Sequence, residues 1–304
     1  MCDGARSLPH KVRPVVEICK REYRAIVAEV NRKMCGQRYP DSAAVTYHLF
    51  CGTESPRDDF GAPFKLGLRP LGNDQVLIKD SNYAYDLNEK RRLMTQNAEA
   101  VWQQTPESLT AQREAFAHLF PTRKPSNDQA PLLTAGLQCQ EDVVVMLPTT
   151  AGHILGAGSV CFPSSWRLAD KIGKPMTQVH APVPGFQDGT RPAQMIERLF
   201  THMRPTQPMV RMNWSVVETN ALHTPNAHER SIDIQQNWQS LWLRVERQTL
   251  SKLPKSQAVL FTIRIFLEPL AAFKAVTDDR RWEAFLTQIA TMTPAQKNYK
   301  GILS

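Results

Sequence analysis

The sequence of 304 residues lacks the short motifs of several common protein classes. It has no phosphate-binding loop, no GxGxxG after a predicted strand, no GxSxG and no HExxH, which disfavours common nucleotide-binding proteins, serine hydrolases and zinc peptidases. It also has no run of eighteen apolar residues, and its N-terminal segment lacks the apolar core of a secretory signal. From these absences we expect a cytoplasmic protein that does not enter a membrane.

Closely spaced metal-binding residues are also missing. The six cysteines are scattered without any CxxC pair, so the sequence encodes neither a local zinc ribbon nor a cysteine-bound iron–sulfur cluster. The eight histidines form no cluster, which disfavours a centre built from several histidines. A single histidine can still serve as the proximal ligand of haem iron, because the porphyrin supplies four of the donors.

The charge balance is basic, with a formal net charge of +8 at pH 7. Such an excess is compatible with nucleic acid, an anionic cofactor or an acidic partner protein. The basic residues are spread along the chain and no nucleic-acid-binding motif accompanies them, so we do not expect a nucleic-acid partner. The basic surface could dock an acidic protein or contribute only to solubility.

The first 130 residues are predicted to be mainly helical, because apolar side chains recur at three- and four-residue steps over long stretches. The expected elements are a helix over 13–35, a hairpin or extended ribbon over 63–87, a helix over 86–104, a helix from Pro106 to His118 with Thr105 as its N-cap, and a polar linker over 121–131.

After residue 130 the pattern changes to strand-length segments rich in β-branched and aromatic residues. This pattern predicts a largely antiparallel sheet interrupted by helices, an α+β fold. Strands are expected within 141–148, 153–166, 208–219, 241–248 and 257–267, and helical patches within 188–203, 249–253 and 278–292.

His180 lies in the segment KPMTQVHAPVPGF, which also carries Pro175, Pro182 and Pro184. Because proline fixes its own φ and biases the preceding residue toward extended conformations, this segment cannot be a helix interior or a central strand. It predicts a stiff loop that holds one imidazole. Considered alone, such a histidine can be a structural hydrogen-bonding residue or a metal ligand.

Charged residues alternate with apolar ones in the segments LWLRVERQ and VLFTIRIF. Alternation places Arg244 and Glu246 on one face of the first strand. One interpretation is a buried ion pair between Glu246 and either Arg264 or Arg244, since unpaired buried charges are costly. The other is that arginines here, with Arg211 and Arg247, bind carboxylates such as haem propionates through forked donors.

An ordered series of longer motifs resembles the haem-dependent oxidative N-demethylase alpha-subunit family over roughly residues 60 to 301. The motifs are QEDVVVM, FPSSWRLADKIGKPMTQVHAPVPGF, RMNWSV, LRVERQTLSKLPKSQAVLFTIRIFLEPL and the terminal YKG. The resemblance implies a PAS-like, haem-binding antiparallel sheet with C-terminal helices over 131–304. It is preceded by a mostly helical part over 56–130 and a helical extension over 1–55 that has no counterpart.

The resemblance also implies a chemistry. A b-type haem would catalyse oxidative, monooxygenase-type removal of a methyl group from a secondary amine, giving a primary amine and formaldehyde with O2 as oxidant. Electrons would come from NADPH through FMN and a 2Fe–2S cluster on a partner reductase subunit. Family membership alone also leaves a haem-based PAS sensor or a non-catalytic interaction protein as alternatives.

Residue roles follow from the same resemblance. His180, the one histidine of the long shared motif, is the expected axial iron ligand. Arg211, in the segment RMNW beside Trp214, is expected to act in haem-pocket electrostatics or oxygen activation. Arg247 and Arg264 are expected as propionate or structural partners. Glu246 is expected to attract the substrate ammonium, and its interpretation as a member of a structural ion pair stands beside that role.

Overall fold

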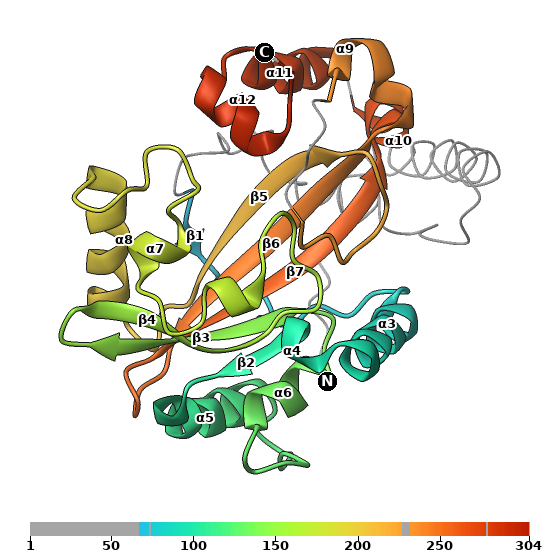
Figure 1. The fold of residues 1–304 in the computed structure, drawn as a ribbon. Coiled ribbons are helices and arrows are strands. Elements are labelled where there is room, and N and C mark those ends of the chain that lie inside the picture. The colour runs from blue at the N-terminus through green and yellow to red at the C-terminus, as the bar shows by residue number, and fades with distance from the viewer. Residues whose placement is uncertain (1–66, 73, 227–231, 278, 304) are drawn as a thin grey trace, which may run out of the picture.

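The computed structural model describes residues 67–72, 74–226, 232–277 and 279–303. The helix expected over 13–35 lies outside these ranges. None of the helices in the described ranges is both long enough and apolar enough to cross a membrane. The described residues form an α+β fold built on one antiparallel sheet, which confirms the predicted class (Figure 1).

Seven strands form the sheet in the described part of the chain, in the spatial order β1-β5-β6-β7-β3-β4-β2. In chain order they are β1 (Arg69–Pro70), β2 (Trp102–Gln104), β3 (Asp142–Thr149), β4 (Gly152–Ser159), β5 (Met209–Val217), β6 (Trp242–Lys252) and β7 (Val259–Pro269). All neighbouring pairs are antiparallel. The five strands predicted after residue 130 are therefore confirmed.

The helices connect and cover these strands. They are α3 (Tyr83–Gln96), α4 (Ala98–Val101), α5 (Leu109–Leu119), α6 (Pro131–Gly136), α7 (Met176–Val179), α8 (Arg191–His202), α9 (Ile234–Asn237), α10 (Leu270–Val276), α11 (Asp279–Ala290) and α12 (Pro294–Lys300), with short 3-10 turns at Pro106–Ser108, Leu168–Asp170 and Trp238–Ser240. The helices predicted within 188–203 and 278–292 are confirmed. The helix predicted from Pro106 to His118 begins as a 3-10 turn and continues as α5.

Three sequence predictions are wrong in detail. The described part of the segment expected as a hairpin or extended ribbon contains β1 and the start of α3 and no hairpin, and the backbone carbonyls of Gln75 and Val76 accept hydrogen bonds from the Arg247 side chain. The helix expected over 86–104 is interrupted at Asn97, whose side chain caps α4. Residues 249–253 are not helical, because β6 runs on to Lys252 and the Thr249 hydroxyl bonds to that of Thr262 on β7.

The sheet has two differently covered faces. On one face, here called the helix face, α5 and α6 pack on β3, and α10 and α11 pack on β5, β6 and β7. On the other, here called the cavity face, α7, α8 and the loop between them lie over the sheet. In Figure 1 the long strands β5, β6 and β7 run from this region toward the C-terminal helices.

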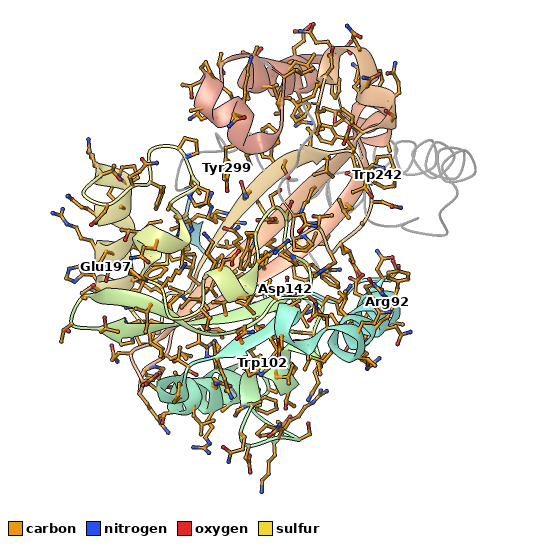
Figure 2. The ribbon with its side chains drawn as sticks, in the orientation of Figure 1. Arg92, Trp102, Asp142, Glu197, Trp242 and Tyr299 are labelled. Atoms are coloured by element: carbon orange, nitrogen blue, oxygen red, sulfur yellow. The ribbon has the colours of Figure 1, made fainter. Side chains whose placement is uncertain are left out.

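The C-terminal helices pack on the sheet through an aromatic cluster. Phe285 of α11 is fully buried and its ring contacts those of Trp214, Phe273 and Trp282, with centroid separations of 5.1 to 5.7 Å. This packing fixes α11 and therefore the position of α12. Figure 2 shows Tyr299 of α12 on the side of that helix that faces the α7–α8 region.

We expect Phe285→Ala to lower the free energy of unfolding by roughly 3–5 kcal/mol, because it removes a fully buried aromatic ring and leaves a cavity. Urea denaturation followed by circular dichroism measures the change. Met195→Ala is the control, since Met195 is exposed on α8 and should shift stability by less than about 0.5 kcal/mol. Equal effects of the two substitutions would contradict the packing described.

Candidate functional site

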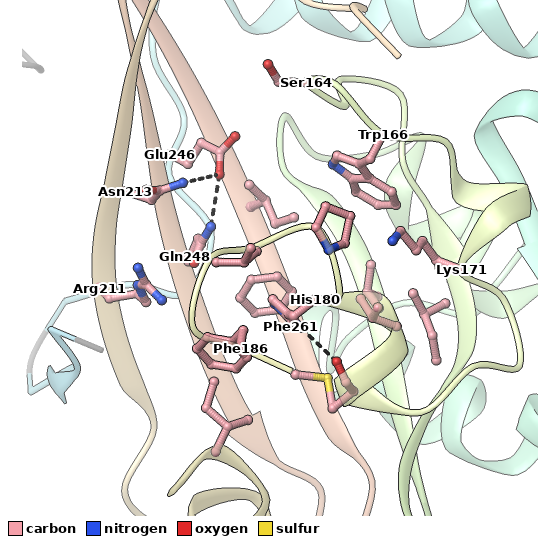
Figure 3. A pocket seen from close by; sticks show the side chains of 18 of the residues that line it. Ser164, Trp166, Lys171, His180, Phe186, Arg211, Asn213, Glu246, Gln248 and Phe261 are labelled. Atoms are coloured by element: carbon pink, nitrogen blue, oxygen red, sulfur yellow. Dashed lines mark hydrogen bonds between the residues drawn. The ribbon is translucent and has the colours of Figure 1, made fainter. Parts of the chain in front are cut away.

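A cavity of about 410 Å³ lies between the cavity face of the sheet and the α7–α8 segment. Its volume falls within the range of roughly 300–1,000 Å³ that is usual for small-molecule and cofactor sites. Apolar side chains from the sheet and from α8 line much of it, among them Met146, Phe261, Ile196 and Phe200. Such a lining suits a large apolar ligand. Figure 3 shows the side chains that line it.

His180 projects into this cavity from the residue that ends α7. Pro175 precedes the helix as its N-cap, and the turn that follows is closed by a hydrogen bond from the Val183 N–H to the His180 carbonyl oxygen, so a short helix and a turn hold the imidazole where a loop was expected. The Nδ1 atom of His180 lies 3.1 Å from the Met176 carbonyl oxygen. Because a carbonyl can only accept, Nδ1 carries the proton and Nε2 carries the free lone pair.

The Nε2 atom of His180 has no hydrogen-bond partner among the described residues. Burial lowers the pKa of His180 to about 4, and nearby Arg211 and Lys171 act in the same direction. The imidazole is therefore neutral near pH 7, which is the state that binds metals. A backbone acceptor on one ring nitrogen and a free second nitrogen is the usual arrangement of a metal-ligating histidine.

The cavity also has a polar wall, which comes from β5 and β6. The two strands pair so that Asn213 lies opposite Glu246. Oxygen Oε2 of Glu246 accepts hydrogen bonds from Asn213 Nδ2 at 3.2 Å and from Gln248 Nε2 at 2.9 Å (Figure 3). Oxygen Oε1 lies 3.6 Å from Nε of the buried Arg244. Of the two predicted pairings for Glu246, the structure therefore contains the one with Arg244.

Arg211 of β5 also lines the cavity. Its Nε atom is buried, and no hydrogen bond or ion pair to the guanidinium forms within the described residues. Burial lowers the pKa of Arg211, and Glu246 opposes that shift. A partly buried guanidinium without a partner is costly, so this position fits an anionic group of a bound molecule.

Sequence reasoning missed two lysines and one tyrosine that reach the cavity from other elements. Lys171 lies in the loop before α7, and its Nζ atom lies 3.5 Å from the Gln178 carbonyl oxygen. Tyr299 and Lys300 come from α12. The terminal motif YKG marked this segment in the sequence, but nothing local in it indicated that its side chains reach a cavity formed by other elements.

Trp214, Arg247 and Arg264 do not line the cavity. Trp214 belongs to the core cluster under α11, on the helix face. Arg247 donates to the carbonyls of Gln75 and Val76, and lies opposite Arg264 in the β6–β7 register. Strand alternation turns these side chains away from Arg211 and Glu246, so this cavity gives no support to the haem contacts expected for them.

Arg264 instead has structural partners, the other role expected for it. Its Nη2 lies 2.7 Å from Asp80 Oδ2 and its Nη1 lies 3.1 Å from Asp86 Oδ2. All three side chains are buried. The contacts fasten the segment before α3, and α3 itself, to the helix face of β7.

The comparison with known families gives one finding. The model of a family described as haem-dependent oxidative N-demethylase, alpha subunit-like, matches residues 116–304. The matched range is more than half of the chain and includes His180, Arg211 and Glu246. It begins within α5, so the upstream part of the expected resemblance, from about residue 60, lies outside it.

We expect Arg264→Met to lower the free energy of unfolding by roughly 3–5 kcal/mol, because it leaves the buried carboxylates of Asp80 and Asp86 without their cation. Denaturant titration measures this change. Since Arg264 points away from the cavity, the ligand content per folded molecule should stay at the wild-type level. A stable variant that loses its ligand would contradict this assignment.

Proposed function

We propose that this chain, which belongs to the haem-dependent oxidative N-demethylase, alpha subunit-like family, binds b-type haem in its cavity and removes a methyl group from a small secondary amine. Oxygen would be the oxidant and formaldehyde a product. The observation that carries the proposal is His180, which lines the cavity with Nδ1 bonded to a backbone carbonyl and Nε2 without a partner among the described residues.

We also propose that the fold is PAS-like. The support is the order of the five long strands, which run β4-β3-β7-β6-β5 across the sheet and so read 2-1-5-4-3 when numbered among themselves. The first and last of these strands are neighbours at the centre, and the helical connection between the second and third covers the cavity face. A cofactor pocket between one sheet face and that connection is the arrangement such a fold requires.

The residues around the cavity fit haem by their chemistry. His180 would bind the iron through Nε2, with the Met176 carbonyl fixing the ring orientation. The apolar lining suits the porphyrin, and Phe186, whose ring centroid is 5.2 Å from that of His180, would pack beside the ligand. When bound, the haem supplies the oxygen-dependent oxidation of the methyl group.

Two cations of the cavity would neutralise the carboxylates of the cofactor or contribute to oxygen activation. Arg211 and Lys171 both line the cavity, and Arg211 lacks a partner within the described residues. Guanidinium groups favour carboxylates because their forked donors match both oxygens. We propose Arg211 as the main electrostatic residue of the pocket and Lys171 as a second partner for an anionic group.

Glu246 would hold the substrate ammonium. Its side chain is 18% exposed, lines the cavity, and is kept in place by Asn213 and Gln248. The aromatic rings of Trp166, Phe186 and Phe261 line the same cavity and present faces that attract cations. The chain would thus bind and orient a protonated amine while the apolar walls exclude water from the site.

Electrons would come from NADPH through FMN and a 2Fe–2S cluster on a partner reductase subunit. Burial raises the pKa of Cys139 and of Cys161 to about 12, so the two thiols are protonated near pH 7. An iron–sulfur cluster needs thiolates, so these two cysteines of the described residues are poor ligands for one. The basic net charge of +8 would suit docking to an acidic partner.

We expect His180→Ala to abolish or strongly reduce haem incorporation, because it removes the proposed iron ligand. The Soret band of purified, haem-supplemented protein measures it. His202→Ala is the control, since His202 is exposed on α8 and outside the cavity. An unaltered haem spectrum in His180→Ala would overturn the ligand assignment, and a colourless wild-type protein would favour a non-haem interaction protein.

We expect Glu246→Gln to raise the KM for a test secondary amine such as dimethylamine by about 10- to 100-fold with a smaller effect on kcat, because a hydrogen bond to a charged group contributes roughly 1.5–3 kcal/mol. Formaldehyde release with a competent reductase measures turnover. Glu218→Gln is the control, since Glu218 is exposed and does not line the cavity. No turnover by haem-loaded wild-type protein, over a range of amines, would favour a haem-based sensor.

A further inference from the structure

The C-terminal helix α12 reaches the cavity around one edge of the sheet. Strand β1 pairs only with Met209 and Val210, and among the described residues no strand lies beside the rest of β5 on that side. Lys300, the last residue of α12, fills this position. Its Nζ donates to the Trp214 carbonyl oxygen at 2.6 Å and lies 3.4 Å from Asn213 Oδ1.

This contact bears on the orientation of Asn213. The two ends of a side-chain amide have nearly the same shape, so its orientation depends on its hydrogen-bond partners. An ammonium can only donate. With Oδ1 turned toward Lys300, Nδ2 is turned toward Glu246 and donates to its Oε2 at 3.2 Å. The reversed amide would place an NH2 group against the ammonium and a carbonyl oxygen against the carboxylate.

Burying the ammonium group of a lysine at position 300 is energetically unfavourable. Lys300 is only 7% exposed, and burial lowers its pKa to about 8, with Glu246 opposing the shift and Arg211 adding to it. A methionine of similar length would avoid the cost of burying a charge. The buried ammonium of Lys300 lies beside Asn213, which binds the Glu246 carboxylate in the cavity. This placement points to a role in the site rather than in packing alone.

We propose that Lys300 is a positioning residue for the Glu246 carboxylate and acts through the side-chain amide of Asn213. With Asn213 and Gln248 both donating to Oε2, the carboxylate is held in one orientation and Oε1 keeps acceptor capacity for a ligand in the cavity. The part that concerns substrate affinity rests on the proposed function, in which Glu246 binds the ammonium.

The orientation can be tested without turnover. In protein labelled with 15N-asparagine, the Asn213 side-chain amide is assigned by its loss in Asn213→Leu, and its hydrogen exchange is measured. We expect slow exchange in the wild type, because Nδ2 is bonded to Glu246, and exchange at least tenfold faster in Lys300→Met. Lys297→Met on the same helix is the control and should leave the exchange unchanged. Equally slow exchange in Lys300→Met would overturn the proposal.

If Lys300→Met does not fold, Lys300→Gln provides the same test. A glutamine amide can donate or accept, so it no longer dictates which way Asn213 faces. We expect faster exchange in this variant as well. Retained slow exchange would overturn the proposal.

A double-mutant cycle on dimethylammonium binding tests the coupling to Glu246. We expect Lys300→Met and Asn213→Leu each to weaken binding by about tenfold. The double variant should bind no more weakly than either single variant, since both substitutions break the same series of contacts from Lys300 through Asn213 to Glu246. Calorimetry on haem-loaded protein measures this. Additive losses would overturn the proposal. Absence of amine binding in the wild type would refute the proposed function, and the exchange experiment would then decide the role of Lys300 alone.

Discussion

The antiparallel register between β5 and β6 determines what the cavity can bind. It sets Asn213 opposite Glu246 and, two residues along, Arg211 opposite Gln248, so that four polar side chains meet on one face. Because side chains alternate along a strand, a shift of β5 by one residue would turn Arg211 and Asn213 away from the cavity and bring Trp214 toward it. Every role assigned to the polar wall depends on this one pairing.

Buried cations join the connecting segments to the sheet. Lys90 of α3 donates to the Gly136 carbonyl oxygen and lies 3.5 Å from the Asp142 carboxylate, which in turn accepts from the backbone of Cys161 and Phe162. The loop that borders the cavity is therefore tied to β3 and, through Lys90, to α3. Removing such a cation is costly because its buried partners keep their charge, so these contacts fix the loops in one arrangement.

The local parts of this structure were predictable and the contacts between distant parts were not. Alternation and β-branched content located β3 to β7, and the prolines around His180 indicated its constrained loop. Arg211 lines the cavity, whereas Arg264 pairs with buried carboxylates on the other face of the sheet. Predicting this difference requires the pairing register between strands, which the sequence of a single strand does not encode. Lys171 and Lys300 lie in motifs of the resemblance, but nothing in those motifs indicates that they reach the site, because they enter it from a loop and a helix that only the folded chain brings to it.

The burial of Cys139 and Cys161 affects how readily their thiols are oxidised. Oxidants attack the thiolate form of cysteine and need access to it. Both sulfurs are enclosed in the core and hold their protons, so they resist conversion to sulfenic or higher acids. A chain that handled oxygen beside a redox centre would therefore tolerate escaped peroxide without damage at these two positions.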